Sequence, residues 1–391
     1  MISVGEALEQ AFGLAPAMPS ENVRLEAAAG RVLVEPAAAR RDQPPFPASA
    51  MDGYAVTNAE VRPGAAFTVI GESSAGTRFD GTVGAGQAVR IFTGAPVPLG
   101  ADRVVIQEDV DRDGDRISLK DGLDQSLYVR PAGTDFAAGA RMEAPRRLGP
   151  SDLGLLAAMN VPVVEVARRP VVAIIASGDE LVWPGEEPGA DQIISSNTFA
   201  LSAIAQMEGA ETRVLPIARD NPESIRLCFN LAKGADLIVT SGGASVGDYD
   251  MIFPVAAELG MQQSFYKVAM RPGKPLMAGK LGDAMVLGLP GNPVSSIVCG
   301  HVFMRPVLRA MQGLPARALN RQMAPLAEAI AQNGPREHYM RAILGEDGTL
   351  RVATRQDSSL LSVVAGSNAL AVRAPGDPAR EPGEMIEFIS I

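Results

Sequence analysis

The sequence contains few of the residues that most often carry acid–base, metal or redox chemistry. Its 391 residues include two histidines, two cysteines and one tryptophan. Cys228 and Cys299 lie in apolar helical patterns without the paired spacing of a disulfide or zinc site. We therefore expect buried free thiols and a reducing, cytoplasmic environment. His301 falls in a helix pattern and His338 in a strand pattern, so we expect both to be structural, which disfavours histidine catalysis and His-rich metal sites.

Positive charge and long apolar runs are also scarce. The formal net charge is −10, which argues against broad binding to nucleic acid or to an anionic membrane, since both need a basic face. An anionic small molecule can still bind where Lys, Arg and backbone N–H groups gather locally. No stretch approaches the roughly 18 apolar residues of a membrane span. The opening MISVGEALEQAFGL lacks the basic and apolar regions of a signal peptide, so none is expected.

Glycine and proline, in contrast, are abundant, with 40 and 30 residues, and indicate many short connections. The length suggests two to four domains. A helix is expected over residues 3–14, and a second helix, capped by Ser151, is expected to pack beside it. Between these helices, residues 46–139 contain short strands separated by turns, typical of an inserted β domain. Residues 320–391 return to short strands and predict a small C-terminal β domain.

Residues 169–313 differ from the rest because buried strands alternate with helices. PVVAIIA, TRVLPIA and DLIVT read as strands, and SNTFALSAIAQMEG reads as a helix. The helix after residue 220 has Asp220 or Asn221 as its cap and apolar residues at helical spacing. Such alternation predicts a mostly parallel sheet with helices on both faces. In sheets of this kind, ligands bind beyond the carboxyl ends of the strands.

Several loops of this region share that strand-end position. ASGDELVWPG offers Asp179 and Glu180, and SGGASVGDYD offers Asp248 and Asp250. Asp220 comes just after the second strand, TRVLPIA, and LPGNPVSS opens a helix whose free N–H groups suit an anion. A single glycine turn or strand-end aspartate is usually only a turn or a helix cap. Their convergence on one edge, however, predicts an anion site with a carboxylate-held magnesium ion.

A basic segment, YKVAMRPGKP, joins this edge with Lys267, Arg271 and Lys274. Magnesium favours a few carboxylates together with substrate phosphate oxygens. Carboxylates, cations and glycine loops together suit phosphoryl or nucleotidyl transfer, in which developing charge must be neutralised. The β region adds two proline-stiffened loops: PPFPASAMDGYAV presents Ser49, Met51 and Asp52 before a turn, and RIFTGAPVPLGAD presents Thr93.

In this order, the motifs SAMDGYA, FTGAPVP, VRPAGTDF, SGDEL, SNTFAL, SGGASVGDYD, RPGKP and GLPGNPVSS resemble those of the MoeA family of molybdopterin molybdenumtransferases, which includes the gephyrin and plant Cnx1 E-domains. They extend from Pro45 to Ser296, with weaker similarity beyond. The resemblance implies a multidomain fold of α/β and β type. Its expected domains are an elongated N-terminal domain (1–45 and 140–168), an inserted β domain (46–139), a MogA-like α/β domain (169–313) and a C-terminal β domain (320–391).

The resemblance also implies an activity. Members of the family insert molybdate into adenylylated molybdopterin, with Mg²⁺-dependent cleavage of the pyrophosphate bond and release of AMP. They form homodimers, with a cleft between the α/β domain of one subunit and the inserted domain of the other. MogA-type enzymes and molybdoenzyme maturation proteins are the implied partners, and neither nucleic acid nor membrane is expected.

The motif matches nominate individual residues. The expected catalytic residues are Asp52, Thr93, Asp135, Glu180, Asp220 and Asp250, of which the last three are also the expected magnesium ligands. The expected substrate-binding residues are Ser241, Gly242, Gly243, Ser245, Lys267, Arg271, Lys274, Pro290, Gly291, Asn292, Pro293, Arg341 and Ser358. Arg271 stands where the family often has lysine, and its planar guanidinium binds anions differently. Asp248 is expected to shape its turn or to cap the next helix.

Three other interpretations share part of these features. A MogA-type molybdopterin adenylyltransferase would have the α/β domain, but residues 46–139 argue against a single-domain protein of that type. A scaffold that keeps the gephyrin E-type fold without catalysis is disfavoured by the retained acidic and basic residues. A CinA-type nucleotide-processing enzyme would share the α/β fold only.

Overall fold

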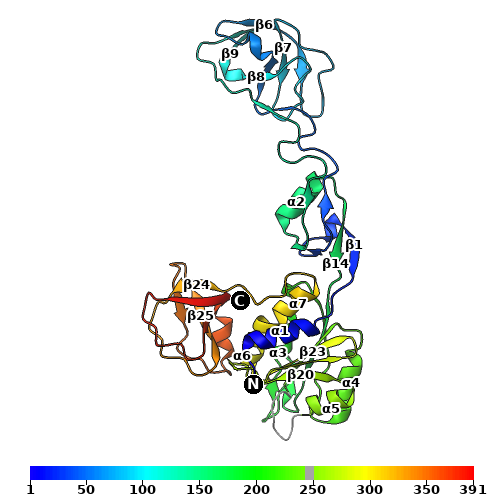
Figure 1. Ribbon diagram of the computed structural model, residues 1–391, viewed down its shortest axis with the longest axis vertical. Helices are drawn as coiled ribbons and strands as arrows, with labels where there is room; N and C mark the ends of the chain where they lie inside the picture. Colours follow the sequence, from blue (N-terminus) through cyan, green and yellow to red (C-terminus); the bar gives the residue numbers. More distant parts are fainter. Residues whose placement is uncertain (243–250) are drawn as a thin grey trace.

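The computed structural model describes residues 1–242 and 251–391 of the chain. The residues nominated at Gly243, Ser245, Asp248 and Asp250 lie outside this part. The molecule is elongated: the α/β domain and the C-terminal β domain lie side by side at one end, and the inserted β domain lies at the other (Figure 1). A narrow middle region joins the two ends. None of the helices in the described ranges is both long and apolar enough to cross a membrane.

The α/β domain is built on a six-stranded sheet in the order β18-β15-β19-β23-β22-β20. The first three pairs in this order are parallel and the last two antiparallel. The strands are β18 (Glu211–Val214), β15 (Val171–Ala176), β19 (Leu237–Ser241), β23 (Ala284–Leu289), β22 (Met277–Leu281) and β20 (Gln262–Tyr266). Both β19 and β23 are fully buried, as expected of strands covered on both faces. The predicted mostly parallel sheet is confirmed.

Helices cover both faces of this sheet. One face packs against α4 (Pro222–Leu231) and α5 (Ile252–Glu258), and the other against α3 (Asn197–Met207) and the final helical segment. That segment comprises α6 (Pro293–Cys299), a π-helical turn η4 (Gly300–Met304) and α7 (Arg305–Met311). Pro306 has no N–H to donate to the preceding turn, and the helix widens to a π-helix immediately before it. A short excursion beside α3 contains β16 (Leu181–Val182) and β17 (Ile193–Ile194).

The first helix, α1 (Val4–Leu14), also belongs to this core. It begins with a capping box between Ser3 and Glu6, and its buried residues join the hydrophobic cluster of the α/β sheet. The expectation that it packs beside the second helix is therefore wrong. The second helix, α2 (Pro150–Ala158), packs in a separate cluster in the middle of the molecule. Its N-cap is Gly149 and not Ser151, because the Asp152 carboxylate accepts the Gly149 N–H at 2.9 Å.

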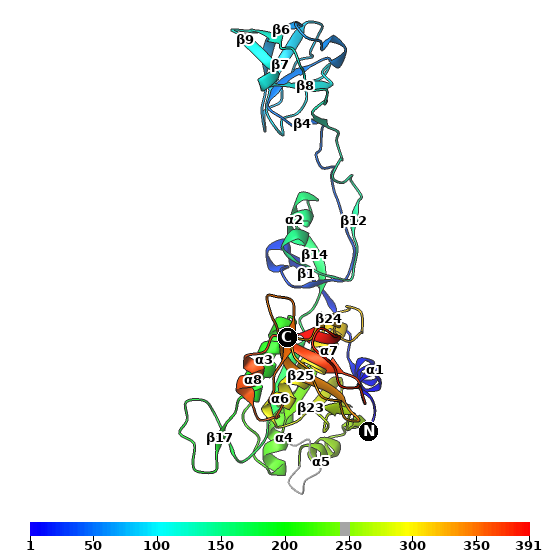
Figure 2. The ribbon, with the colours of Figure 1, turned by 90° about the vertical axis from the view of Figure 1, so that its left-hand side faces the viewer.

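We call the middle region the stem, and it consists of α2 and six short strands (Figure 2). Four form a sheet in the order β1-β14-β2-β13, with β1 (Ser20–Arg24), β14 (Val163–Ala167), β2 (Val32–Leu33) and β13 (Arg146–Arg147). The other two, β3 (Ala37–Ala38) and β12 (Arg141–Met142), pair with each other. The stem therefore combines chain from before and after the inserted domain.

A buried ion network joins the stem to the α/β domain. Glu208, directly after α3, is 4% exposed. Its carboxylate accepts from Arg147 Nη2 of the stem at 2.9 Å and from Arg305 Nε of α7 at 2.9 Å. Arg309 Nη1 lies 3.9 Å from the same carboxylate. Because a buried carboxylate is stable only when paired, this network fixes the stem against the α/β domain.

The inserted β domain contains a six-stranded sheet in the order β8-β5-β7-β6-β10-β9, and a separate pair, β4 with β11. The strands are β4 (Ala48–Ser49), β5 (Gly53–Val56), β6 (Ala66–Ser73), β7 (Gln87–Ile91), β8 (Arg103–Ile106), β9 (Val110–Asp113), β10 (Arg116–Leu119) and β11 (Val129–Arg130). Three 3₁₀ turns complete the N-terminal half: η1 (Leu25–Ala27), η2 (Asn58–Glu60) and η3 (Gln107–Asp109).

The C-terminal sheet has the order β21-β25-β27-β28-β24, with β26 paired to β25. Its strands are β21 (Met270–Arg271), β24 (Gln322–Pro325), β25 (Glu337–Leu344), β26 (Leu350–Val352), β27 (Ala369–Arg373) and β28 (Met385–Ser390), and its helix is α8 (Leu361–Ala365). Strand β21 comes from the α/β domain and pairs in parallel with β25, so that Arg271 lies opposite His338. This pairing brings the C-terminal domain against the segment of the α/β domain that carries Arg271 and Lys274, which we call the basic loop.

Candidate functional site

Two aspartates meet where β15 and the 211–218 segment end. Asp179 N–H donates to Asp220 Oδ2 at 3.3 Å, and Asp220 N–H donates to Asp179 Oδ1 at 3.1 Å. Asn221, not Asp220, caps α4 by accepting the Ser224 N–H at 2.9 Å. Arg219 braces the opposing loop through hydrogen bonds from Nη1 to the carbonyl oxygens of Gly178, Asp179 and Leu181. The Asp220 carboxylate is therefore placed by backbone contacts and has no helix-cap role.

The electrostatics of this pair favour a cation. Burial raises the pKa of the Asp220 carboxyl and the charge of Asp179 raises it too, whereas the Asp179 N–H and Arg219 lower it. Glu180 is exposed, and its carboxylate lies over Gly178, where a Cβ would be 2.2 Å from Oε2. Carboxylates close enough to repel one another fit a hard divalent cation. Within 1–242 and 251–391 no group of three metal-ligating side chains forms, and the third expected ligand, Asp250, lies outside these ranges.

The ends of β19 and β23 are held together beside this pair by Asn197. Its Nδ2 donates to Ser241 Oγ at 2.9 Å and to the Gly291 carbonyl at 2.7 Å. The two loops are close neighbours, since a Cβ added at Gly291 would be in ordinary van der Waals contact with Gly242 Cα, at 3.4 Å. Gly242 itself has φ +97 and lies against Ser177, so a side chain there would be strained and would collide. Ser241, Gly242 and Gly291, all nominated from sequence, thus meet at one place.

A cavity of about 330 Å³ lies between the α/β domain and the C-terminal domain, and we call it the basic cavity. It is lined by Arg271, Pro272, Gly273, Lys274, Pro275, Asn292, Ser295, Arg336, Gln356, Asp357 and Ser358. Asn292 Nδ2 donates to Ser358 Oγ at 3.2 Å across the domain boundary. Pro293 is the first residue of α6, and Pro290 is buried ahead of it. The nominated residues Arg271, Lys274, Asn292 and Ser358 are therefore brought together.

Arg341 lies next to this cavity in β25 and is 0% exposed. Its Nη2 donates to the Asp357 carbonyl at 3.2 Å, while Nε and Nη1 have no hydrogen-bond partner in the described part of the chain. Burial and the neighbouring charge of Arg271 together lower the pKa of Arg341 to about 10, although the Asp357 charge acts in the opposite direction. A buried guanidinium with free donors beside a basic cavity produces a strong local attraction for anions.

Lys267 does not line the basic cavity, although it was expected to act with Arg271 and Lys274. Its Nζ lies 4.8 Å from the centre of the Tyr266 ring, a cation–π contact. Its backbone has φ +68, and its carbonyl accepts the Ile2 N–H at 3.2 Å. The position of Lys267 therefore links the N-terminus to the end of β20.

Asp52 and Thr93 form a second polar centre, in the inserted β domain. Asp52 Oδ1 accepts from the Thr93 N–H at 2.7 Å and from the Thr93 hydroxyl at 2.8 Å. These hydrogen bonds lower the pKa of Asp52, so it is ionised at neutral pH. The two residues flank β5 and β7, at the end of the molecule opposite the α/β domain (Figures 1 and 2). Asp135 is exposed in the segment between the inserted domain and the stem. One copy of the chain does not bring these residues to the sheet edge.

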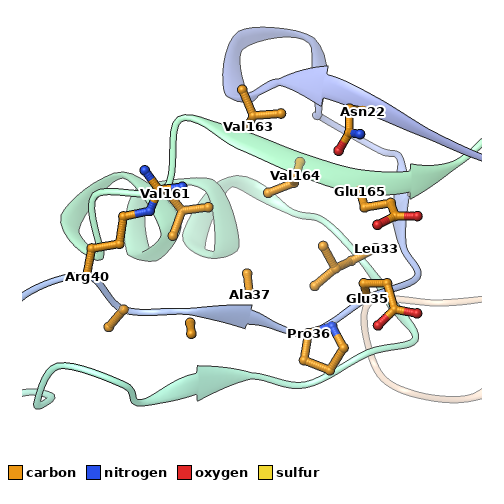
Figure 3. A pocket seen from close by; sticks show the side chains of 12 residues that line it. Asn22, Leu33, Glu35, Pro36, Ala37, Arg40, Val161, Val163, Val164 and Glu165 are labelled. Atoms are coloured by element: carbon orange, nitrogen blue, oxygen red, sulfur yellow. The ribbon is translucent and has the colours of Figure 1, made fainter.

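The stem contains a larger cavity, of about 430 Å³, which is not part of this site. Figure 3 shows Arg40 at one end of it and Glu35 and Glu165 at the other, with valine and leucine side chains between. The Glu165 carboxylate accepts the Ser20 hydroxyl at 2.5 Å. None of the residues nominated from sequence lines this cavity, so the basic cavity and the aspartate pair define the candidate site.

Three residues of the site were not identified from the sequence. Asn197 lay within the noted motif SNTFAL, but an asparagine at a helix start ordinarily reads as a cap. Arg219 precedes Asp220 directly, yet nothing in the sequence shows that it folds back onto the loop before β16. Arg336 lines the basic cavity from the C-terminal domain, and no local pattern distinguishes it from the other arginines of that domain.

Comparison with known proteins covers the whole chain. Residues 2–160 match the MoeA N-terminal region (domain I and II), residues 173–310 a probable molybdopterin binding domain, and residues 323–391 the MoeA C-terminal region (domain IV). A molybdopterin molybdenumtransferase of Nostoc sp. is 35% identical over 100% of this chain and 94% of its own. One from Haemophilus influenzae is 35% identical over 75% of this chain and 73% of its own. The crystal structure of the molybdopterin biosynthesis moeA protein from Pyrococcus horikoshii OT3 superposes with a TM-score of 0.87, at 26% identity and 100% coverage of both chains.

Proposed function

Because the chain belongs to the MoeA family, we propose that it is a molybdopterin molybdenumtransferase that inserts molybdate into adenylylated molybdopterin and releases AMP. The Nostoc relative bears that enzyme name and matches the full length of this chain. The observation that supports the proposal most directly is the sheet edge itself. There the paired aspartates and the basic cavity lie on either side of the Asn197 contacts.

The basic cavity is the proposed molybdate site. Molybdate is a small dianion, and Arg271, Lys274 and Arg336 supply positive charge around a volume of about 330 Å³. Arg341 adds buried donors that have no partner within the described residues. An anion in the cavity would offset the mutual repulsion of Arg271 and Arg341. Ser358 and Asn292 supply uncharged hydrogen-bonding groups at the same place.

The aspartate side is the proposed site of pyrophosphate cleavage. Glu180, Asp220 and Asp250 are the proposed ligands of a magnesium ion, which when bound would neutralise charge on the phosphate oxygens. Ser241 and Gly242, with Gly243 and Ser245, are proposed to cradle the phosphate through backbone N–H and hydroxyl groups. Lys267 and the prolines Pro290 and Pro293 are proposed to shape the edge of the substrate path.

No side-chain nucleophile is needed for this reaction. An oxygen of molybdate or of water forms the new bond to phosphorus as the pyrophosphate P–O bond breaks, and AMP departs. The residues of the chain orient the two substrates and stabilise the charge that develops between them. The two dithiolene sulfurs of the pterin then bond to molybdenum, and one oxide of the molybdate leaves as water with the two thiol protons.

The remaining nominated residues support a homodimer. Asp52, Thr93 and Asp135 belong to the part of the chain that lies away from the sheet edge, and the Asp52 carboxylate is ionised. We propose that the inserted domain of one subunit completes the site of the other. The free buried thiols suit a reducing cytoplasm, where adenylylating MogA-type enzymes would supply the substrate and maturing molybdoenzymes would receive the product.

An AMP-release assay tests this function. The wild-type protein is incubated with adenylylated molybdopterin, Mg²⁺ and molybdate, with each component omitted in turn. Release of AMP that requires molybdate is the expected result, and Asp220→Asn should abolish it while the protein keeps its melting temperature. Consumption of ATP with unmodified molybdopterin would instead identify a MogA-type enzyme. Inert, folded protein would identify a scaffold.

A further inference from the structure

Asn197 connects two loops that are far apart in the sequence. It is the first residue of α3 and is partly buried. Both hydrogens of its amide group are engaged, one by Ser241 Oγ at 2.9 Å and the other by the Gly291 carbonyl at 2.7 Å. These partners lie 44 and 94 residues away along the chain. Helix capping does not explain the contacts, because the Asn197 side chain donates to loops outside its own helix.

Each partner belongs to a different half of the candidate site. Ser241 ends β19, and its carbonyl accepts the N–H of Ser177, at the start of the loop that carries Asp179 and Glu180. Gly291 immediately precedes Asn292, whose side chain donates to Ser358 Oγ on the wall of the basic cavity. Asn197 is therefore a direct side-chain link between the acidic loops and the basic cavity, beside a weaker contact of 3.4 Å between the Ser241 and Ser296 hydroxyls.

The backbone at Gly242 is tightly constrained where the two loops meet. Gly242 has a left-handed backbone with φ +97, and a Cβ there would lie 2.7 Å from the Ser177 carbonyl oxygen. The Gly291 carbonyl requires a donor, whereas the Ser241 hydroxyl can donate or accept. The Asn197 amide nitrogen supplies the donor that the Gly291 carbonyl requires and a second donor for the Ser241 hydroxyl. An isosteric carboxylate would place an oxygen against the Gly291 carbonyl and repel it.

We propose that Asn197 is a positioning residue for the transfer reaction, holding the phosphate-cleaving loops and the molybdate cavity at a fixed separation. The inference rests on the proposed function, since it concerns how the two substrates are held relative to each other. Asn197 does not line the basic cavity. Its loss therefore changes the alignment of bound substrates and leaves molybdate binding intact.

Steady-state kinetics of Asn197→Asp test this role. A misalignment of about 1 Å can reduce the rate about a hundredfold, so we expect kcat to fall about 10- to 100-fold with KM for molybdate within about twofold of wild type. Asn197→Ser, which removes both contacts without adding charge, should show the same split and serves if the aspartate variant does not fold. A kcat within twofold of wild type in the folded variant, or a change in KM alone, overturns the proposal.

Asn368→Asp is the matched control. Asn368 also bridges backbone groups, since Oδ1 accepts from Leu344 N–H at 2.8 Å and Nδ2 donates to the Leu344 carbonyl at 3.1 Å. The same chemical change there should leave kcat unaltered at a similar melting temperature. An equal loss of kcat in this control would mean that general destabilisation explains the effect, and would overturn the proposal.

Hydrogen–deuterium exchange separates this inference from the proposed function. Asn197→Asp should accelerate amide exchange in segments 237–242 and 289–293, whereas Asn368→Asp should not. If wild-type protein releases no AMP, the proposed function fails, yet the exchange result still shows whether Asn197 couples the loops. Unchanged exchange in both segments contradicts that coupling.

Discussion

At the scale of single residues, Arg341 shows a conflict between stability and binding. Its guanidinium is fully buried, and two of its donor nitrogens have no partner in the described chain. Such a group costs free energy in the absence of an anion. The same free donors become charge-assisted hydrogen bonds when an oxyanion is present. An arginine in this state is therefore expected to favour an anion nearby and to lower the stability of the empty protein.

Arg341→Met should separate these two effects. We expect KM for molybdate to rise about 10- to 100-fold, because one charge-assisted hydrogen bond is worth roughly 1.5–3 kcal/mol. The free energy of unfolding should stay unchanged or rise, since an uncompensated buried charge is removed. Denaturant unfolding and AMP-release kinetics measure the two quantities.

Arg373, a buried arginine that does have a carboxylate partner, is the control for Arg341. It is 1% exposed but is paired with Asp377 and donates to the carbonyls of Ala331 and Pro378. Arg373→Met should lower the free energy of unfolding by about 3–5 kcal/mol, because Asp377 loses this buried partner, and should leave KM for molybdate unaltered. If Arg341→Met were the more destabilising variant, the description of Arg341 as an unpaired charge would be wrong.

The two histidines give the fold a defined sensitivity to acid. Burial, together with the charge of neighbouring arginines, lowers the pKa of His301 and of His338 from an ordinary value near 6.5 to about 4. The unfolded chain therefore binds more protons between these values. Stability is fully present above about pH 6.5 and is lost as the pH falls towards 4, by up to about 3 kcal/mol for each histidine.

The double variant His301→Gln/His338→Gln should show a flatter decline over that pH range. Carboxylates also titrate there, but they contribute equally to both proteins, so the difference isolates the histidines. Urea unfolding at half-unit pH steps measures it. Parallel curves for the wild type and the variant would mean that the imidazoles do not control acid stability.

At the scale of elements, the basic loop depends on a close contact with α6. A Cβ at Gly273 would lie 2.4 Å from Cys299 Sγ, and the residue has φ +107. Gly273→Ala should therefore displace the loop that carries Arg271 and Lys274, raise KM for molybdate and reduce stability by about 2–4 kcal/mol. Gly260→Ala is the matched control, because Gly260 has φ +94 but open space around its Cβ position. Equal losses in the two variants would contradict a steric role for Gly273.

Some secondary-structure elements and their packing could be predicted from the sequence, and others could not. The alternation of buried strands and helices over residues 169–313 follows from local periodicity, so the sheet and its ligand-binding edge could be predicted. The packing of α1 could not, because its apolar stripe fits any core within reach of the N-terminus. The cap of α2 depended on Asp152, three residues after Gly149, and not on the serine beside it. The links made by Asn197 and Arg219 depend on strand register between distant segments, which no local pattern encodes.

At the scale of the whole molecule, the candidate residues are divided between two ends. Asp52 and Thr93 lie in the inserted domain, and Asp220 lies at the edge of the α/β sheet. If the inserted domain of one copy completes the site of another, two inactive variants should complement each other. Mixing Asp52→Ala with Asp220→Ala subunits, under conditions that allow exchange, should restore up to about a quarter of wild-type AMP release, since half the dimers are mixed and each has one intact site.

The control is a mixture of Asp52→Ala with Thr93→Ala. Both changes lie in the same domain, so every site in every dimer keeps one defect and no activity should return. Size-exclusion chromatography would verify that all variants assemble equally. Activity that stays at background in the Asp52/Asp220 mixture, despite subunit exchange, would show that each chain works alone.

The buried Glu208 network also affects how the two ends of the molecule are held relative to each other. The stem is a lever arm, with Glu208 and its arginines as the pivot and the inserted β domain, which carries the Asp52–Thr93 pair, at the other end. A small rotation at a pivot produces a displacement that grows with the length of the arm. If the inserted domain of one copy completes the site of another, the accuracy of that contact depends on how rigidly Glu208 and its arginine partners hold the base of the stem.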